Sequence, residues 1–237
     1  MSNTFTFNGQ NSGDFGVWIS GSGTYNMPER DVTIFEVPGR NGNLVVDNGR
    51  YKNVQVVYPA SIPFGFAEKA QALRTWLGAQ LNYERLTDDY DTTHYRLGRF
   101  VGGLDFSPTA LNEGAEFSIA FDCKPQRFLI SGDTPMVYYS STFSIFNPSP
   151  FPSKPTIVVR GSGAGSLNFN GATINISQID ELITLDFETQ TAYKGTTNLN
   201  SRITLAEGFP DLMPGINSGS FSGGITRIDI YPRWWEL

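Results

Sequence analysis

The stretch LNFNGATINIS, residues Leu167–Ser177, decides the fold of the second half of this chain. Apolar and polar side chains alternate on either side of Asn170-Gly171, which is the pattern of two half-buried strands. Asn and Gly tolerate the positive φ angles that a two-residue hairpin turn needs at both central positions. The stretch therefore predicts a β-hairpin whose strands are Leu167–Phe169 and Thr173–Ser177.

Strands of the same kind are predicted on both sides of this hairpin. Further strand patterns occupy Thr156–Arg160, Leu182–Phe187, Ile203–Leu205 and Thr226–Tyr231. The glycine-rich stretch Gly161–Ser166 lacks the third Gly of a dinucleotide-binding loop, and a strand follows it, so we expect a flexible hairpin connection there. Short strands with frequent turns and no helical pattern predict a β-sandwich for the second half.

The composition of the whole chain agrees with a folded, β-rich protein. Among 237 residues, 25 are Gly and 14 are Pro, which makes long helices improbable. Aromatic residues reach 14% and charged residues only 17%, below the roughly 25% typical of soluble domains. A chain of this kind can bury a large core, so disorder is excluded.

The first half combines short strands with a single helix. Apolar residues at helical spacing predict a helix over Phe66 to about Gln80, with a polar opposite face and therefore one side against a sheet. Period-two alternation predicts strands at Val54–Tyr58 and Phe117–Cys123. Three Asn-Gly pairs predict tight turns, and they lie at Asn8-Gly9, Asn41-Gly42 and Asn48-Gly49.

The change in character after Cys123 indicates two domains. Four prolines between Asn147 and Pro155 restrict that segment to extended geometry. We place the boundary near residue 133, which gives domains 1–133 and 134–237.

Charge and cysteine content exclude several function classes. The formal net charge of −6 argues against a surface that grips nucleic acid or anionic lipid. The single cysteine, Cys123, excludes an intrachain disulfide and a multi-cysteine zinc site, and favours assembly in a reducing cytosol. Neither a signal peptide nor an apolar run of about 18 residues is present, so no membrane association is expected.

No group of residues predicts catalysis or metal binding. The only histidine is His94, and Cys123 falls on the inward phase of its strand, where a thiol is inert. The cluster Asp88, Asp89 and Asp91 has the wrong spacing for an EF-hand, so we interpret it as a solvated turn. The sequence therefore predicts a protein that is not an enzyme and has no catalytic, cofactor-binding or metal-binding residues.

Two adjacent tryptophans, Trp234 and Trp235, leave a choice open. They could stack on sugar rings, but adjacent residues of a strand point to opposite faces and cannot form one flat platform. We expect one ring to pack inward, and the other is a candidate contact with another subunit.

Several segments taken together resemble the distal tail protein (Dit) family of long-tailed, siphovirus-type bacteriophages of Gram-positive hosts. Phe5–Gly9 and Asp14–Val17 fit the opening strand and turn of that family. The more specific segments follow in the expected order: Arg30–Val32, Val37–Gly42, Asp47–Tyr51, Phe121–Pro125, Pro152–Ile157 and Pro232–Leu237. They span nearly the whole chain.

The resemblance implies a fold and an assembly. The fold would be mainly β, with an N-terminal β-sandwich, flanked by one packing α-helix and similar to tail-tube subunits, and a C-terminal galectin-like β-sandwich. The first domain would form a homo-hexameric ring at the virion tail tip, made and assembled in the bacterial host cytoplasm. The ring would join the tail tube protein to the tail-associated tip protein and to receptor-binding proteins, and DNA would pass through it without specific binding.

Candidate interface residues lie in the segments that carry the resemblance. We expect a protruding loop to contact a neighbouring subunit, with residues Pro38, Gly39, Arg40, Asn41 and Gly42, and we add Arg50 to this set. Arg40 could hold a carboxylate with two hydrogen bonds. Two other classes of function stay open: a carbohydrate-binding sandwich, supported only by Trp234 and Trp235, and a glycan hydrolase, which would need a pair of carboxylates in a cleft.

Overall fold

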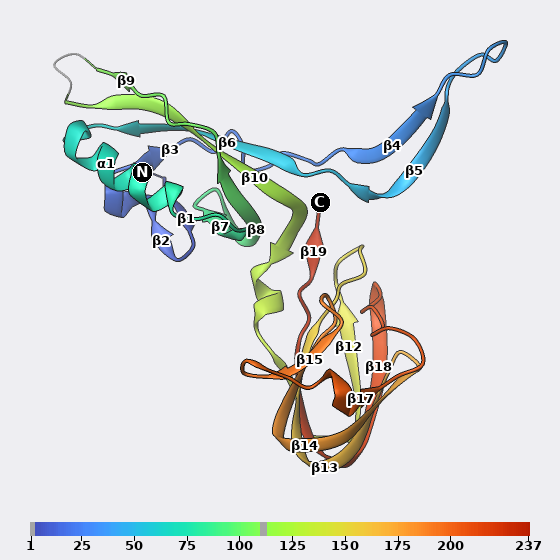
Figure 1. Cartoon of the computed structure of the whole chain (residues 1–237). Coiled ribbons are helices and arrows are strands. Elements are labelled where there is room, and N and C mark those ends of the chain that lie inside the picture. The colour runs from blue at the N-terminus through green and yellow to red at the C-terminus, as the bar shows by residue number, and fades with distance from the viewer. Residues whose placement is uncertain (1–2, 110–112) are drawn as a thin grey trace. The chain divides into compact units, whose positions relative to one another are not determined.

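The hairpin predicted at Asn170-Gly171 is confirmed in the computed structural model, which describes residues 3–109 and 113–237 (Figure 1). Asn170 and Gly171 have φ angles of 48° and 85° and join β13 (Thr156–Phe169) to β14 (Ala172–Asp186). Phe169 pairs with Ala172 across the turn. The described residues are mainly β, as expected, and form two compact units, Met1–Arg127 with Leu237 and Phe128–Glu236.

One sheet organises the N-terminal unit. Its strand order is β2-β1-β7-β8-β10-β6-β3, and β9 pairs with β10 as well. The strands are β1 (Phe5–Phe7), β2 (Gln10–Asn11), β3 (Trp18–Ile19), β6 (Val54–Ile62), β7 (Glu84–Asp88), β8 (Asp91–Val101), β9 (Ser107–Pro108) and β10 (Ala115–Leu129). The predicted strands at 54–58 and 117–123 lie in β6 and β10, whose registers pair Val56 with Phe121. Their alternating side chains place one row in the core.

The helix α1 (Phe66–Gly78) covers one face of this sheet (Figure 1). It buries Ala70, Leu73, Trp76 and Leu77, which confirms the predicted apolar stripe. The helix ends two residues before the expected Gln80. Trp76 stacks on the ring of Phe15 with centroids 4.4 Å apart, so the short 3-10 helix η1 (Ser12–Phe15) packs against α1.

A two-stranded ribbon, paired separately from the main sheet, belongs to the same unit. The strands β4 (Arg30–Phe35) and β5 (Leu44–Tyr51) pair only with each other among the described residues, and we call them, with the connecting loop 36–43, the arm. Gly39 and Gly42 both have φ near 80° in that loop, as the predicted turn requires. The turn predicted at Asn48-Gly49 is wrong: both residues lie inside β5, beside a register shift opposite β4.

The C-terminal unit folds its strands around one core, which agrees with the β-sandwich expected for this half. The sheet order is β11-β18-β13-β14-β15-β16, and β12 and β17 pair with β18 and β14. Besides β13 and β14, the elements are η3 (Ile130–Asp133), β11 (Met136–Tyr138), β12 (Thr142–Asn147), β15 (Thr191–Lys194), β16 (Thr197–Asn198), η4 (Asn200–Arg202), β17 (Ile203–Thr204), β18 (Gly215–Tyr231) and β19 (Trp235–Glu236).

The connection predicted at Gly161–Ser166 is also wrong, because this stretch continues β13 between β14 and β18. The glycines permit an unusually close approach of the strands. A Cβ atom at Gly161 would lie 2.0 Å from the carbonyl oxygen of Gly224, and one at Gly165 would lie 2.6 Å from Ile225. Small residues here therefore serve the packing of two strands rather than a flexible loop.

Candidate assembly surface

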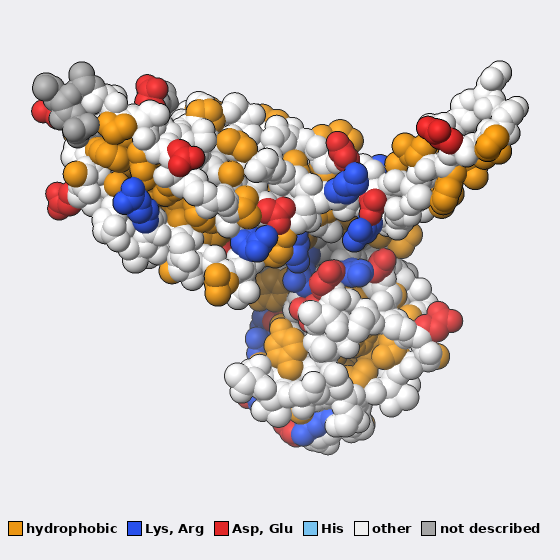
Figure 2. Space-filling model, turned by 45° about the horizontal axis from the view of Figure 1, so that its top comes forward, with side chains coloured by type: hydrophobic (Ala, Val, Ile, Leu, Met, Phe, Trp, Pro, Cys, Tyr) orange, Lys and Arg blue, Asp and Glu red, His pale blue; other side chains and the backbone are white. Residues whose placement is uncertain are grey.

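The arm exposes apolar side chains along most of its length. The residues involved are Ile34, Phe35, Val37, Leu44, Val45 and Val46, each at least 41% exposed. On the side of the molecule drawn in Figure 2, hydrophobic side chains gather along the arm. Contiguous apolar surface of this kind marks an interaction site in a soluble protein.

The apolar residues occupy both faces of the ribbon. Phe35 pairs with Leu44, and the next pair along is Ile34 with Val45. Directly opposed residues share a face, whereas successive pairs alternate between faces. Each face of the outer arm therefore carries an apolar pair, and among the described residues neither face belongs to the hydrophobic core of the unit. An isolated two-stranded ribbon is marginal in water, so this one is suited to being covered.

The base of the arm is polar and stiffened by ion pairs. Arg30 Nε donates to Asp47 Oδ1 at 3.0 Å, and Arg50 Nε donates to Asp31 Oδ2 at 2.6 Å. These hydrogen bonds hold the pKa of both Asp47 and Asp31 below the usual range. The arm therefore has a charged base and an apolar outer half.

The predicted interface residues divide between the two ends of the arm. Pro38, Gly39, Arg40, Asn41 and Gly42 lie together in the loop at its tip. Arg50 lies near the base, where its side chain is 77% exposed. The structure thus brings five of the six together.

Sequence reasoning missed the apolar strands next to that loop. Val32–Phe35 and Leu44–Val46 contain little alternation of apolar and polar residues. A short continuous apolar run is typical of a strand buried on both faces. The Asn-Gly turn between the two runs indicates a hairpin, but only the topology shows that none of the described residues of the same unit pairs with it.

The two tryptophans lie within the C-terminal unit. Trp234 is 6% exposed and belongs to its hydrophobic core. Trp235 stacks on Phe151 with centroids 4.4 Å apart, and its Nε1 donates to the carbonyl oxygen of Pro152 at 2.8 Å. One ring therefore points inward and the other packs on the proline-rich segment. This arrangement offers no open pair of rings to a sugar, and the proposed subunit contact stays a prediction.

The residues considered for catalysis have structural surroundings. Cys123 is fully buried, and burial raises the pKa of its thiol to about 12. His94 Nδ1 lies 3.0 Å from Asp91 Oδ2, and Arg127 forms an ion pair with the same carboxylate. Among the described residues, no group of three or more His, Cys, Asp or Glu side chains is placed to hold a metal ion.

The acidic turn differs from the expectation of a solvated loop. Asp88 accepts hydrogen bonds from the hydroxyls of Tyr58 and Thr24, at 2.6 and 2.8 Å, and Asp91 is only 12% exposed in its side chain. Only Asp89 of the three is exposed. Asp88 and Asp91 are enclosed because their carboxylates accept hydrogen bonds from hydroxyl and guanidinium donors inside the unit.

A groove of about 690 Å³ lies in the N-terminal unit between β10 and the segment 101–107 that begins at the end of β8. Its lining among the described residues includes Asp105 and Glu116 and contains neither Lys nor Arg. The other lining residues are uncharged, and they include Ser118, Ala120 and Phe117. Within the part of the chain that is described, no helix is long and apolar enough to cross a membrane.

The chain resembles known proteins in its structure but not in its sequence. No family model matches the chain, and no curated protein matches it. The crystal structure of the Dit protein of phage SPP1, described as a paradigm of the hub adsorption apparatus in phages that infect Gram-positive hosts, matches with a TM-score of 0.77 over 100% of both chains at 10% identity. The chain has the Dit fold.

A second solved structure points the same way. A chain of the phage P2 baseplate, in its activated conformation with calcium, matches this Dit-fold chain with a TM-score of 0.50 at 11% identity, over 97% of this chain and 98% of that one. The resemblance found in the sequence segments is thus confirmed at the level of the fold.

Proposed function

We propose that this chain is a structural subunit of a phage tail-tip hub, which acts through assembly and has no catalytic role. The observation that supports this most strongly is the arm, a ribbon apolar on both faces, in a chain that shares the Dit fold over its full length. The named relatives are hub and baseplate proteins. A protein that acts only by assembling with other subunits needs no reactive side chain.

The proposed assembly is a hexameric ring in which each arm lies on the neighbouring copy. Burial of apolar surface contributes roughly 25 cal/mol per Å², so an arm covered on both faces adds substantially to the contact. In the part of the chain that the structure describes, the outer edges of β4 and β5 pair with no other strand, so they can extend a sheet of the neighbour. At the tip, Arg40 can reach a carboxylate of the next copy, and Arg50 lies at the base of the same surface.

The acidic groove supplies the proposed wall of a central channel. Asp105 and Glu116 face outward there, and the chain carries a net charge of −6. A negative wall repels DNA phosphates, so DNA passes through without specific binding.

The proposed partners are other proteins of the tail. The ring joins the tail tube protein to the tail-associated tip protein, with receptor-binding proteins at its rim, and Trp235 is a candidate contact residue there. The proposed location is the virion tail tip, after assembly in the cytoplasm of the bacterial host.

The test is the oligomeric state of arm variants. We expect the full chain to form a species of six times the 26.2 kDa chain mass in size-exclusion chromatography with light scattering, and rings in negative stain. The double variant Ile34→Asp, Val45→Asp places two negative charges on one apolar face of the arm, so it should give monomers. The matched control is Ile216→Asp, an apolar residue of the other unit that is 80% exposed, which should leave the ring intact.

A monomeric wild-type chain at high concentration would contradict the proposal. If that monomer also bound glycans saturably, the carbohydrate-binding function would replace it.

A further inference from the structure

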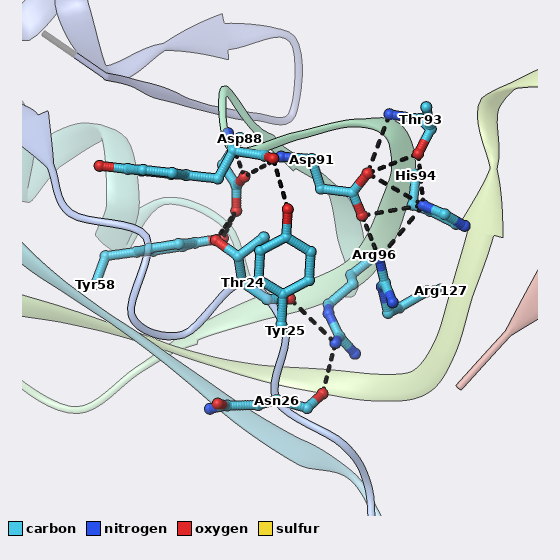
Figure 3. Close-up of polar contacts among 11 residues, drawn as sticks. Thr24, Tyr25, Asn26, Tyr58, Asp88, Asp91, Thr93, His94, Arg96 and Arg127 are labelled. Carbon is cyan, nitrogen blue, oxygen red and sulfur yellow. Dashed lines mark hydrogen bonds and ion pairs between the residues drawn. The ribbon is translucent and has the colours of Figure 1, made fainter. Parts of the chain in front are cut away.

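The loop 20–29 leads from β3 into the arm, and buried side chains of the sheet hold its backbone. Figure 3 shows the polar contacts around Thr24, Tyr25 and Asn26 of this loop. The partners come from β6, β7, β8 and β10. Because the arm begins at Arg30, these contacts lie at its root.

Arg96 of β8 makes the central contact. It is only 6% exposed, and its Nη2 donates to the carbonyl oxygens of Asn26 at 2.7 Å and Thr24 at 3.4 Å (Figure 3). Within the described ranges, no carboxylate forms an ion pair with Arg96. Burying a guanidinium without a directly paired carboxylate is unfavourable, and the best-attested use of such a group is to specify one arrangement. Here the arrangement is that of two backbone carbonyls on either side of Tyr25.

A second set of contacts holds the side chains of the same loop. Thr24 and Tyr58 both donate their hydroxyls to Asp88, so this carboxylate ties the loop to β6 and β7. Tyr25 donates its hydroxyl to the carbonyl oxygen of Tyr90 at 2.7 Å. The Arg127 guanidinium lies 5.7 Å from the Tyr25 ring centroid. These interactions fix side chains of the loop, in addition to the backbone contacts that Arg96 makes.

Two glycines allow the loop to approach this closely. A Cβ atom at Gly21 would lie 2.4 Å from the ring of Tyr90, and one at Gly23 would lie 2.7 Å from the backbone nitrogen of Val57. Beyond Asn26, Met27 is 71% exposed and Pro28 is buried, and the arm begins at Arg30. The contacts of Arg96 and Asp88 therefore hold the chain a few residues before the arm begins.

We infer that Arg96, with its acceptors in the loop and the Thr24–Asp88 contact, forms an arm-root clamp that sets the direction in which the arm leaves the sheet. This inference rests on the proposed function of the arm as an assembly surface. Head-to-tail contacts close into a ring only if each copy meets the next at one fixed rotation, and otherwise give open chains. The clamp supplies that rotation, and the apolar outer arm supplies the adhesion.

The first test measures the direction of the arm without reference to assembly. Nitroxide labels are attached to Asn41→Cys at the tip and Gln71→Cys on the exposed side of α1, while Cys123 is fully buried and stays unlabelled. Labelled full-length chain is diluted with unlabelled chain, and pulsed electron paramagnetic resonance gives the distance distribution. We expect a narrow distribution for the parent chain and a clearly broader one for Arg96→Met.

Controls separate the clamp from general damage. Arg74→Met removes an exposed arginine from α1 and should leave the distribution narrow. Because a buried substitution can prevent folding, Thr24→Val serves as a second variant that removes only the hydroxyl that donates to Asp88. Circular dichroism verifies that each variant is folded. A distribution as narrow as that of the parent in both folded clamp variants would overturn the inference.

The second test examines assembly in negative stain. Clamp variants should still associate but give open and mixed oligomers, whereas the Ile34→Asp, Val45→Asp variant should give monomers. Closed rings from a clamp variant with a broad distance distribution would overturn the link between clamp and ring closure. If the arm variant assembles normally, the proposed function of the arm fails, and the distance measurement still decides whether the clamp fixes its direction.

Discussion

Two hairpins of this chain have the same Asn-Gly turn, but the apolar side chains of one are buried and those of the other are exposed. The β13–β14 hairpin buries Leu167, Phe169 and Ile174 completely, whereas the arm leaves Phe35 and Ile34 at least half exposed. Both turns contain Asn-Gly with glycine at positive φ. The difference lies in the pattern of side chains, because β13–β14 is apolar on one face and the outer arm on both.

This difference shows what each hairpin is for. A ribbon with one apolar face completes its burial within its own domain, and the polar face meets water. A ribbon with two apolar faces cannot be covered by one layer, so it requires further chain on either side. Under the proposed function, that further chain belongs to another subunit.

Truncating one phenylalanine in each hairpin should affect the two hairpins very differently. Phe169→Ala should lower the free energy of unfolding by about 3–5 kcal/mol, since it leaves a cavity in a packed core. Phe35→Ala should change the stability of the monomer by less than about 0.5 kcal/mol, because its ring is exposed there. Urea unfolding of chain held monomeric by dilution measures both. Equal losses would mean that the arm is part of the folded core.

The sequence predicts the C-terminal hairpin because local and tertiary patterns coincide there. Alternation at 167–177 reports burial of one face, and the structure buries that face. At the arm the two patterns separate: the apolar run of β5 is the one expected for a buried strand, yet Val45 is 57% exposed. The missing information is which strands pair, and no local pattern carries it.

The sequence does not predict the arm-root clamp, for a related reason. Arg96 lies in a strand with polar and charged neighbours, and nothing in their order shows which arginine is buried. Its acceptors are carbonyl groups some 70 positions earlier in the chain, and backbone carbonyls have no sequence signature. Gly21 and Gly23 could have indicated a close approach of the backbone, but only once the loop was placed beside Tyr90 and Val57.

The enclosed carboxylate of Asp91 should contribute to the stability of the fold in a way that depends on pH. Burial tends to raise the pKa of Asp91, but hydrogen bonds from Thr93, Arg127 and His94 outweigh it and hold that pKa well below its ordinary 3.8. A lowered folded-state pKa stabilises the fold above the unfolded pKa, and this contribution disappears as the pH falls through the folded value.

Asp91→Asn should therefore destabilise the chain most at neutral pH, and its deficit against the parent should shrink once the pH falls below about 4. Thermal unfolding across the acid range measures the deficit. Asp105→Asn, at an exposed position, controls for the loss of one negative charge. A deficit that stays constant down to the lowest pH would show that the carboxylate charge of Asp91 contributes nothing to stability.

The smallest expected effect concerns the two turns themselves. Gly171 and Gly42 have φ angles of 85° and 80°, and neither position has an atom within 4 Å of an added Cβ, so alanine meets the same backbone strain in both. That strain is on the order of 1 kcal/mol for an L residue.

Gly171→Ala should lower the global free energy of unfolding by this amount, because β13 and β14 unfold with the core. Gly42→Ala should leave it unchanged in the monomer, since a ribbon without a covering layer opens locally and relieves the strain there. Hydrogen exchange at the amides of β5 should increase in the Gly42 variant instead. Equal shifts in global unfolding would show that the arm is cooperative with its domain even before a neighbour covers it.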